Sequence, residues 1–196
     1  MINNRMAQIA FGAVLMTAAA FAQEDYTRYK SEVSAQGLGS FVKKTTHDGI
    51  QQNATDSGGV MGSYRFWFDR HNGVEANYAW MQNTEKYNQF GLDNNLHEVL
   101  AAYVFRMPMK RWSPFVLAGA GALVFDPKDF AAANTQTRPA FFYGGGADIN
   151  VTDHLFIRGE YRGIVHNSPT YDLVSLNGSD RITHRAQPSV GFGWRF

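Results

Sequence analysis

Cysteine is absent from the 196 residues, so no disulfide can support the fold. After Gln23 no apolar run is long enough to form a transmembrane helix, because glycine or charge interrupts each of them. Neither sign of charge is in excess, since 18 Lys and Arg residues face 17 Asp and Glu residues. Without a basic excess, a nucleic-acid partner is not expected. The fold must therefore be held together without disulfides, and it cannot cross a membrane as helices.

The first 22 residues have the three-part pattern of a secretory signal peptide. Met1 to Arg5 carries one positive charge, and Ala7 to Ala20 is mostly apolar and uncharged. Ala20-Phe21-Ala22 then offers a small-x-small cleavage site. We predict a signal peptide over residues 1–22 and one exported domain over 23–196. Such a chain is either a soluble periplasmic β-protein or a transmembrane β-barrel.

The last residues alternate strictly in character. Phe192, Trp194 and Phe196 share one parity, and the other parity carries Gly191, Gly193 and Arg195. This period of two predicts a strand with one apolar face. An exposed apolar strand is an aggregation hazard in a soluble protein, whereas a transmembrane barrel places that face in lipid.

Eight segments share this alternation, and each is long enough to cross a bilayer as a tilted strand. They are 29–41, 58–69, 73–82, 96–106, 114–125, 139–151, 155–166 and 183–196. The intervening connections alternate between long and short, which is typical of long extracellular loops and tight periplasmic turns. The sequence therefore predicts an all-β, eight-stranded antiparallel up-and-down transmembrane barrel, with the last strand pairing back to the first.

Strand parity also predicts which charges face the interior. The predicted lumen network consists of Lys30, Glu32, Arg65, Glu75, Glu98, Arg106, Asp148, Arg158, Glu160, Arg162, Arg185 and Arg195, with Asp69 on the same parity. An eight-stranded barrel has room inside only for side chains. We therefore expect these charges to pair and plug the lumen. The alternative is a narrow charged path for ions or small solutes.

Two segments carry less regular patterns. Residues 114–125 are apolar on both parities; we expect Phe115, Leu117, Leu123 and Phe125 to face outward, with small residues inward that leave room for arginines. Pro188 lies within the last strand, where its missing N–H predicts a bulge or a local irregularity.

These features together resemble the OmpA/OmpX-type superfamily of small outer-membrane β-barrels. The resemblance covers 23–196 and rests on the signal peptide, the eight strands, the loop asymmetry, the terminal aromatics, and stretches such as Arg158–Arg162 and Trp112–Gly121. It implies an outer-membrane location, contact with membrane lipid and lipopolysaccharide, and recognition of Phe192, Trp194 and Phe196 by the barrel assembly machinery. The fold hosts structural, binding and enzymatic members, so it does not specify an activity.

One constellation suggests an enzyme. His166, Ser168 and Asp180 are similar to the catalytic residues of lipid A deacylase barrels, but the acid is Asp rather than Glu, and the parity of His166 points it into the lumen. The six histidines, at positions 47, 71, 97, 154, 166 and 184, show no metal-ligand spacing. We therefore expect no catalysis, no metal and no cofactor, and favour a structural or surface-interaction role through the long loops.

Overall fold

The computed structural model of the protein describes residues 29–42, 45–47, 50–54, 57–87, 90–127, 135–167 and 182–196. The described chain forms strands β1 (Ser31–Val42), β2 (Thr45–His47), β3 (Ile50–Ala54), β4 (Ser57–Trp67), β5 (Asn72–Tyr87), β6 (Phe90–Arg106), β7 (Trp112–Pro127), β8 (Gln136–Asn150), β9 (Leu155–Asn167) and β10 (Ile182–Arg195). Within these residues no helix has the length and hydrophobicity to span a membrane.

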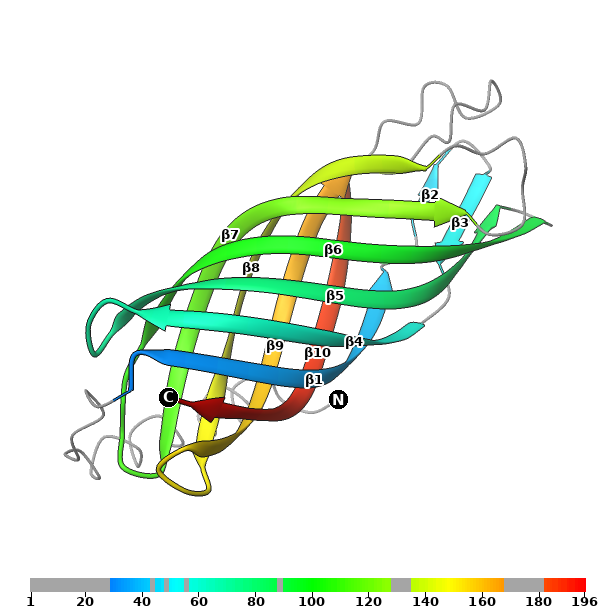
Figure 1. Cartoon of the computed structure of the whole chain (residues 1–196). Coiled ribbons are helices and arrows are strands. Elements are labelled where there is room, and N and C mark those ends of the chain that lie inside the picture. Colours follow the sequence, from blue (N-terminus) through cyan, green and yellow to red (C-terminus); the bar gives the residue numbers. More distant parts are fainter. Residues whose placement is uncertain are drawn as a thin grey trace, which may run out of the picture.

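Eight of these strands close into an antiparallel up-and-down barrel (Figure 1). Each strand pairs with its neighbours in the chain, and β1 closes the cylinder by pairing with β10 from Glu32–Arg195 to Val42–Arg185. All eight predicted strand segments are confirmed. The observed strand ends lie within a few residues of the predicted ones, except that β5 and β6 extend further where they join each other. The closure leaves no barrel strand with a free edge in the membrane, which a lipid environment requires.

Three short connections lie at one end of the barrel, beside the first and last described residues (Figure 1). They join β4 to β5, β6 to β7 and β8 to β9, and Phe196 exchanges backbone hydrogen bonds with Ser31 there. Because short turns face the periplasm in such barrels, we call this the periplasmic end. The strand ends that the long connections join lie at the opposite, extracellular end.

The extracellular end extends further than the sequence indicated. β5 and β6 pair out to Tyr87–Phe90, beyond the expected strand ends. The predicted loop between the first two barrel strands contains β2 and β3, and β3 pairs with β5 at Gln52–Tyr87. Neither short strand has the apolar alternation that would have predicted it.

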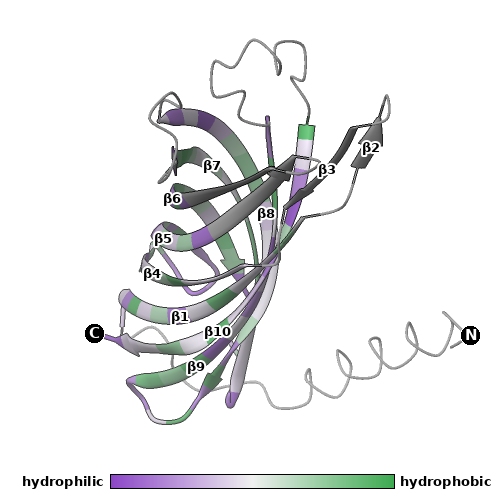
Figure 2. Ribbon diagram, turned by 90° about the vertical axis from the view of Figure 1, so that its right-hand side faces the viewer, coloured by the Kyte–Doolittle hydropathy of each residue, from purple (hydrophilic) through white to green (hydrophobic). Residues whose placement is uncertain are grey.

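The outer surface of the barrel is apolar, as the alternation along the strands predicted. Tyr64, Val99, Tyr103 and Ile157 are all more than two-fifths exposed, while their chain neighbours are buried inside. Hydropathy consequently changes from residue to residue along the strands instead of dividing the strands into classes (Figure 2). A lipid-facing surface of this kind is stable in a bilayer and unstable in water.

β7 reverses the predicted parity. Phe115, Leu117, Leu123 and Phe125 face inward and are at most 4% exposed, whereas Val116 faces lipid and is 58% exposed. The prediction was wrong because both parities of this strand are apolar, so hydrophobicity alone did not orient it. Gly119 and Gly121 share the inward parity and let β6 approach closely, since a Cβ on either would lie 2.0 or 2.1 Å from a carbonyl oxygen of β6.

Pro188 interrupts the ladder without shifting its register. β1 and β10 pair on both sides of Pro188, at Leu38–Ser189 and Phe41–Ala186, and the pairs between them are missing. On its other side, Pro188 pairs with Tyr161 in an unbroken register. The predicted local irregularity is confirmed, and it is a gap in the closing seam instead of a bulge.

Asp69 was predicted to face the interior, and that prediction was wrong. It lies exposed in the β4–β5 turn, where its carboxylate accepts hydrogen bonds from the backbone N–H of His71 and Asn72 and from the Asn72 side chain. These donors, led by the Asn72 side chain, hold the pKa of Asp69 below its ordinary value. Asp69 therefore organises a turn and takes no part in the lumen.

Candidate functional site: the barrel interior

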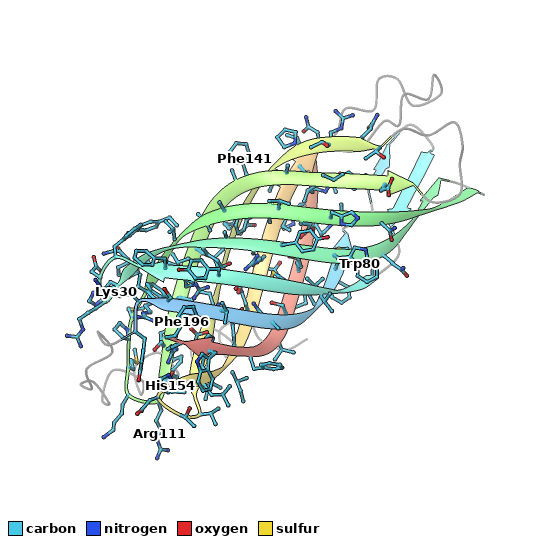
Figure 3. All side chains as sticks on the ribbon, viewed as in Figure 1. Lys30, Trp80, Arg111, Phe141, His154 and Phe196 are labelled. Atoms are coloured by element: carbon cyan, nitrogen blue, oxygen red, sulfur yellow. The ribbon has the colours of Figure 1, made fainter. Side chains whose placement is uncertain are left out.

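The barrel places eleven of the twelve predicted lumen charges inside, each at most 5% exposed. They comprise Glu32, Arg65, Glu75, Glu98, Arg106, Asp148, Arg158, Glu160, Arg162, Arg185 and Arg195. Lys30 differs from the prediction, because it precedes β1 and its side chain is exposed (Figure 3). Its contribution is a backbone carbonyl that accepts a hydrogen bond from Trp67.

Glu32 lies at the periplasmic end of the network and contacts three arginines. One carboxylate oxygen lies 2.8 Å from Nη1 of Arg106 and 3.0 Å from Nε of Arg195. The other oxygen lies 3.1 Å from Nη2 of Arg158. These partners come from β6, β9 and β10, so a single carboxylate from β1 joins four strands across the lumen.

Arg158 occupies the centre of the network. Its Nε and Nη2 donate to the two oxygens of Asp148 at 2.7 and 2.9 Å, which is the bidentate geometry that arginine favours. Its Nη1 lies 3.7 Å from Glu75. Because it also bonds to Glu32, Arg158 contacts three of the five buried carboxylates.

Glu75 links this centre to the next layer. It accepts from Arg65 at 2.5 Å and from Arg162 at 2.6 Å, and Arg162 also pairs with Glu160 on its own strand. Closer to the extracellular end, Glu98 accepts from Arg185 at 3.2 Å and from Gln187 at 2.9 Å. Every buried carboxylate in the described chain therefore has at least one arginine partner.

Aromatic rings lie against several guanidinium groups of the network, whose N–H groups are bonded to the carboxylates. The Arg106 guanidinium carbon lies 3.7 Å from the centre of the Trp67 ring, and that of Arg65 lies 4.3 Å from the Phe115 ring. Arg158 and Arg195 both lie over Phe156, at 4.8 and 4.5 Å. Such cation–π contacts explain why Phe115 faces inward, against the prediction for β7.

An apolar layer fills the extracellular half of the lumen, and the sequence did not indicate it. It consists of Met81, Leu96, Leu123, Phe125, Ala140 and Ile164, each at most 1% exposed and all members of one hydrophobic cluster. Arg185 joins the two layers, since its Nη1 lies 3.8 Å from the Met81 sulfur and also bonds to Glu98. Outside residues 114–125, polarity is what predicts an inward side chain, so the alternation carries no signal for this layer.

The interior of the described barrel combines a charge-paired layer with an apolar layer. Its charges nearly cancel, because six arginines face five carboxylates, and they are paired in low-dielectric surroundings where separating them is costly. The apolar layer opposes wetting, which is how hydrophobic constrictions close pores.

The weak enzyme constellation is only partly visible. His166 lies on the inward parity and is 5% exposed; its Nδ1 lies 3.0 Å from the carbonyl oxygen of Asn167, and its ring lies 5.8 Å from that of Phe125. Ser168 and Asp180 lie outside the described residues. Across the described ranges, no three His, Asp or Glu side chains gather in a way that could hold a metal ion.

The terminal aromatics face lipid at the periplasmic end. Phe192, Trp194 and Phe196 are 63%, 48% and 56% exposed. His154 stacks on Trp194 with ring centres 4.9 Å apart, and its Nδ1 lies 2.9 Å from the carbonyl oxygen of Arg195. This end of β10 is therefore braced by the β8–β9 turn.

A closed eight-stranded barrel with a lipid-facing outer surface and a filled interior defines a small integral protein of the outer membrane. The sequence matches the model of the outer membrane protein beta-barrel domain over residues 9–196, so the chain belongs to that family and resides in the outer membrane. No curated protein matches the sequence significantly.

Solved outer-membrane barrels share the fold. OprG from Pseudomonas aeruginosa superimposes with a TM-score of 0.61 at 14% identity, covering 88% of this chain and 99% of OprG. Neisserial surface protein A gives a TM-score of 0.64 at 12% identity, with 85% and 97% of the two chains covered. Ail, the attachment invasion locus protein of Yersinia pestis, gives 0.54 at 22% identity, with 86% and 99% covered.

Proposed function

We propose that this protein is a plugged outer-membrane barrel whose lumen does not conduct and whose role is structural or surface-interacting. The observation that carries the proposal is the double seal: an ion-paired layer toward the periplasm and an apolar layer above it. Open aqueous channels are a property of much wider barrels.

The outer surface supports the rest of the proposal. Its apolar girdle fits acyl chains of membrane lipid and lipopolysaccharide, and Phe192, Trp194 and Phe196 form the signal that the barrel assembly machinery reads. Partner specificity lies in the extracellular loops, above the point where β6 and β7 cease to pair at Asn94–Pro127. We propose no enzymatic role, and this is supported by His166, the member of the weak triad that the structure describes, which points away from the lipid in which lipid A lies.

Planar-bilayer recording of the refolded chain tests the seal. We expect the wild type to show no conductance. We also expect either layer alone to block conduction when the other is weakened. Leu123→Ser and Phe125→Ser together remove bulk from the apolar layer, and Arg162→Gln with Glu160→Gln weakens the charged layer without changing net charge. Only the combination of both pairs should give steady current steps.

Heat-modifiable gel mobility shows that each variant remains a folded barrel. Steady, discrete conductance in the wild type, lost on substitution of Arg158 or Glu160, would contradict the proposal and support the narrow-channel alternative. Unchanged lipid A acylation in cells carrying Ser168→Ala is the matching expectation for the absence of catalysis.

A further inference from the structure

The β6–β7 turn differs in charge from the other two periplasmic turns. The β4–β5 turn carries both Arg70 and Asp69, and the β8–β9 turn carries Asp153. The β6–β7 turn, residues 107–111, carries Lys110 and Arg111 and no acid, and both side chains are exposed. Of the three described turns it is therefore the one with a net charge of two positive units.

The surface beside this turn is apolar and aromatic. Phe105 near the end of β6 and Met107 in the turn are 39% and 46% exposed, and Ile149 and Val151 on the neighbouring hairpin are 54% and 53% exposed. Trp112 begins β7 opposite Ile149. Tryptophan gathers at the level where acyl chains meet headgroups, so the two cations directly before it lie at headgroup depth.

The turn is held in place from inside the barrel. The backbone N–H of Asn150 donates to the carbonyl of Arg111 at 2.9 Å, and its side-chain amide donates to the carbonyl of Lys110 at 3.5 Å. The same Asn150 side chain accepts from Arg195 at 2.6 Å, and Arg195 is bonded to Glu32. A fixed backbone presents the two cations with less ordering cost when a ligand binds.

We propose that the β6–β7 turn is a binding site for an acidic phospholipid of the periplasmic leaflet. Lys110 and Arg111 contact the headgroup phosphate, to which guanidinium geometry is well suited, while Met107, Trp112 and Val151 contact the glycerol and upper acyl chain. Arg111 lies at the extremity of the periplasmic end (Figure 3). The proposal goes beyond the plugged barrel and does not depend on whether the lumen conducts.

The bilayer is the source of the ligand that these observations favour. A soluble anion would need only the cations, whereas here the cations adjoin an exposed apolar surface on two neighbouring hairpins. Acidic headgroups attract basic residues at a membrane surface by roughly fivefold per residue. Two residues therefore give a preference of roughly five- to thirtyfold for the acidic lipid over a zwitterionic one.

Native mass spectrometry tests the site. The refolded chain is placed in nanodiscs of phosphatidylcholine with a minority of phosphatidylglycerol, and the lipids that stay bound on release are counted. We expect the wild type to retain phosphatidylglycerol preferentially and Lys110→Gln/Arg111→Gln to lose that preference. Lys30→Gln/Arg70→Gln is the matched control, because it removes two exposed periplasmic-end bases elsewhere and should keep the preference.

Several outcomes would overturn the proposal. One is an equal loss in both double variants, which would reflect net charge alone; another is full retention in the Lys110/Arg111 variant. Glycerol phosphate in solution should fail to displace the lipid, and complete displacement would contradict a bilayer source. Binding of a soluble anionic peptidoglycan fragment to this turn, with no preference for phosphatidylglycerol, would assign the turn to the cell wall instead. Gel mobility verifies folding in each case.

Discussion

Among single residues, Arg158 has the greatest consequence for stability, because it contacts Asp148, Glu32 and Glu75 from a fully buried position. We expect Arg158→Gln to lower the free energy of unfolding by about 3–5 kcal/mol, since buried Asp148 loses its bidentate partner and Glu32 and Glu75 each lose one of three arginines. Urea titration of the refolded protein in lipid vesicles, followed by tryptophan fluorescence, measures the change.

The control for Arg158 is a second substitution beside it. Asp148→Asn in the Arg158→Gln background removes the carboxylate that has lost its bidentate partner and keeps only the more distant Arg65 and Arg195, and it should recover part of the loss. Exposed Arg111→Gln should change the unfolding free energy by less than about 0.5 kcal/mol. If Arg158→Gln behaved like Arg111→Gln, the network would not be coupled as the distances indicate.

At the scale of the strand, substitutions in β7 test which of its two faces contacts lipid. Gly121→Ala would bring a Cβ to 2.1 Å from the Val99 carbonyl oxygen, so it should destabilise the barrel by about 1–3 kcal/mol. Ala120→Leu adds bulk to the exposed outer parity and should be tolerated. The same urea titration compares them, and the opposite order of stability would restore the orientation that the sequence first suggested.

For the whole molecule, the buried network predicts that stability is nearly independent of salt. Pairs on a surface weaken as ionic strength rises, but pairs shielded from solvent are screened much less. We expect the urea midpoint in zwitterionic micelles to be almost the same at low and at high sodium chloride. A clear fall with salt would mean that ions enter the lumen, and it would weaken the plugged-barrel proposal independently of any conductance measurement.

The sequence predicted the barrel strands because a membrane imposes opposite demands on their two faces. Charges such as Arg158 and Glu98 could be placed inside, since exposure to lipid would cost about 2–4 kcal/mol for an arginine and less for a glutamate. The same rule failed where inward residues are apolar. Leu96 and Phe125 fill the upper lumen, and nothing in the alternation distinguishes an apolar lumen residue from a lipid-facing one. Partner choice within the network, such as Glu32 with Arg195, depends on register and could not be predicted.

Glu32 also has a consequence for the order of assembly. Its three arginine partners lie 74, 126 and 163 positions away along the chain. A growing sheet that has β1 but not yet β10 therefore holds a carboxylate that lacks part of its coordination, next to lipid. Contacts so remote in sequence form late, because the chain between them must first be ordered. We expect closure of the β1–β10 seam to be the committing step of folding, with the first strand left incomplete until the last one arrives.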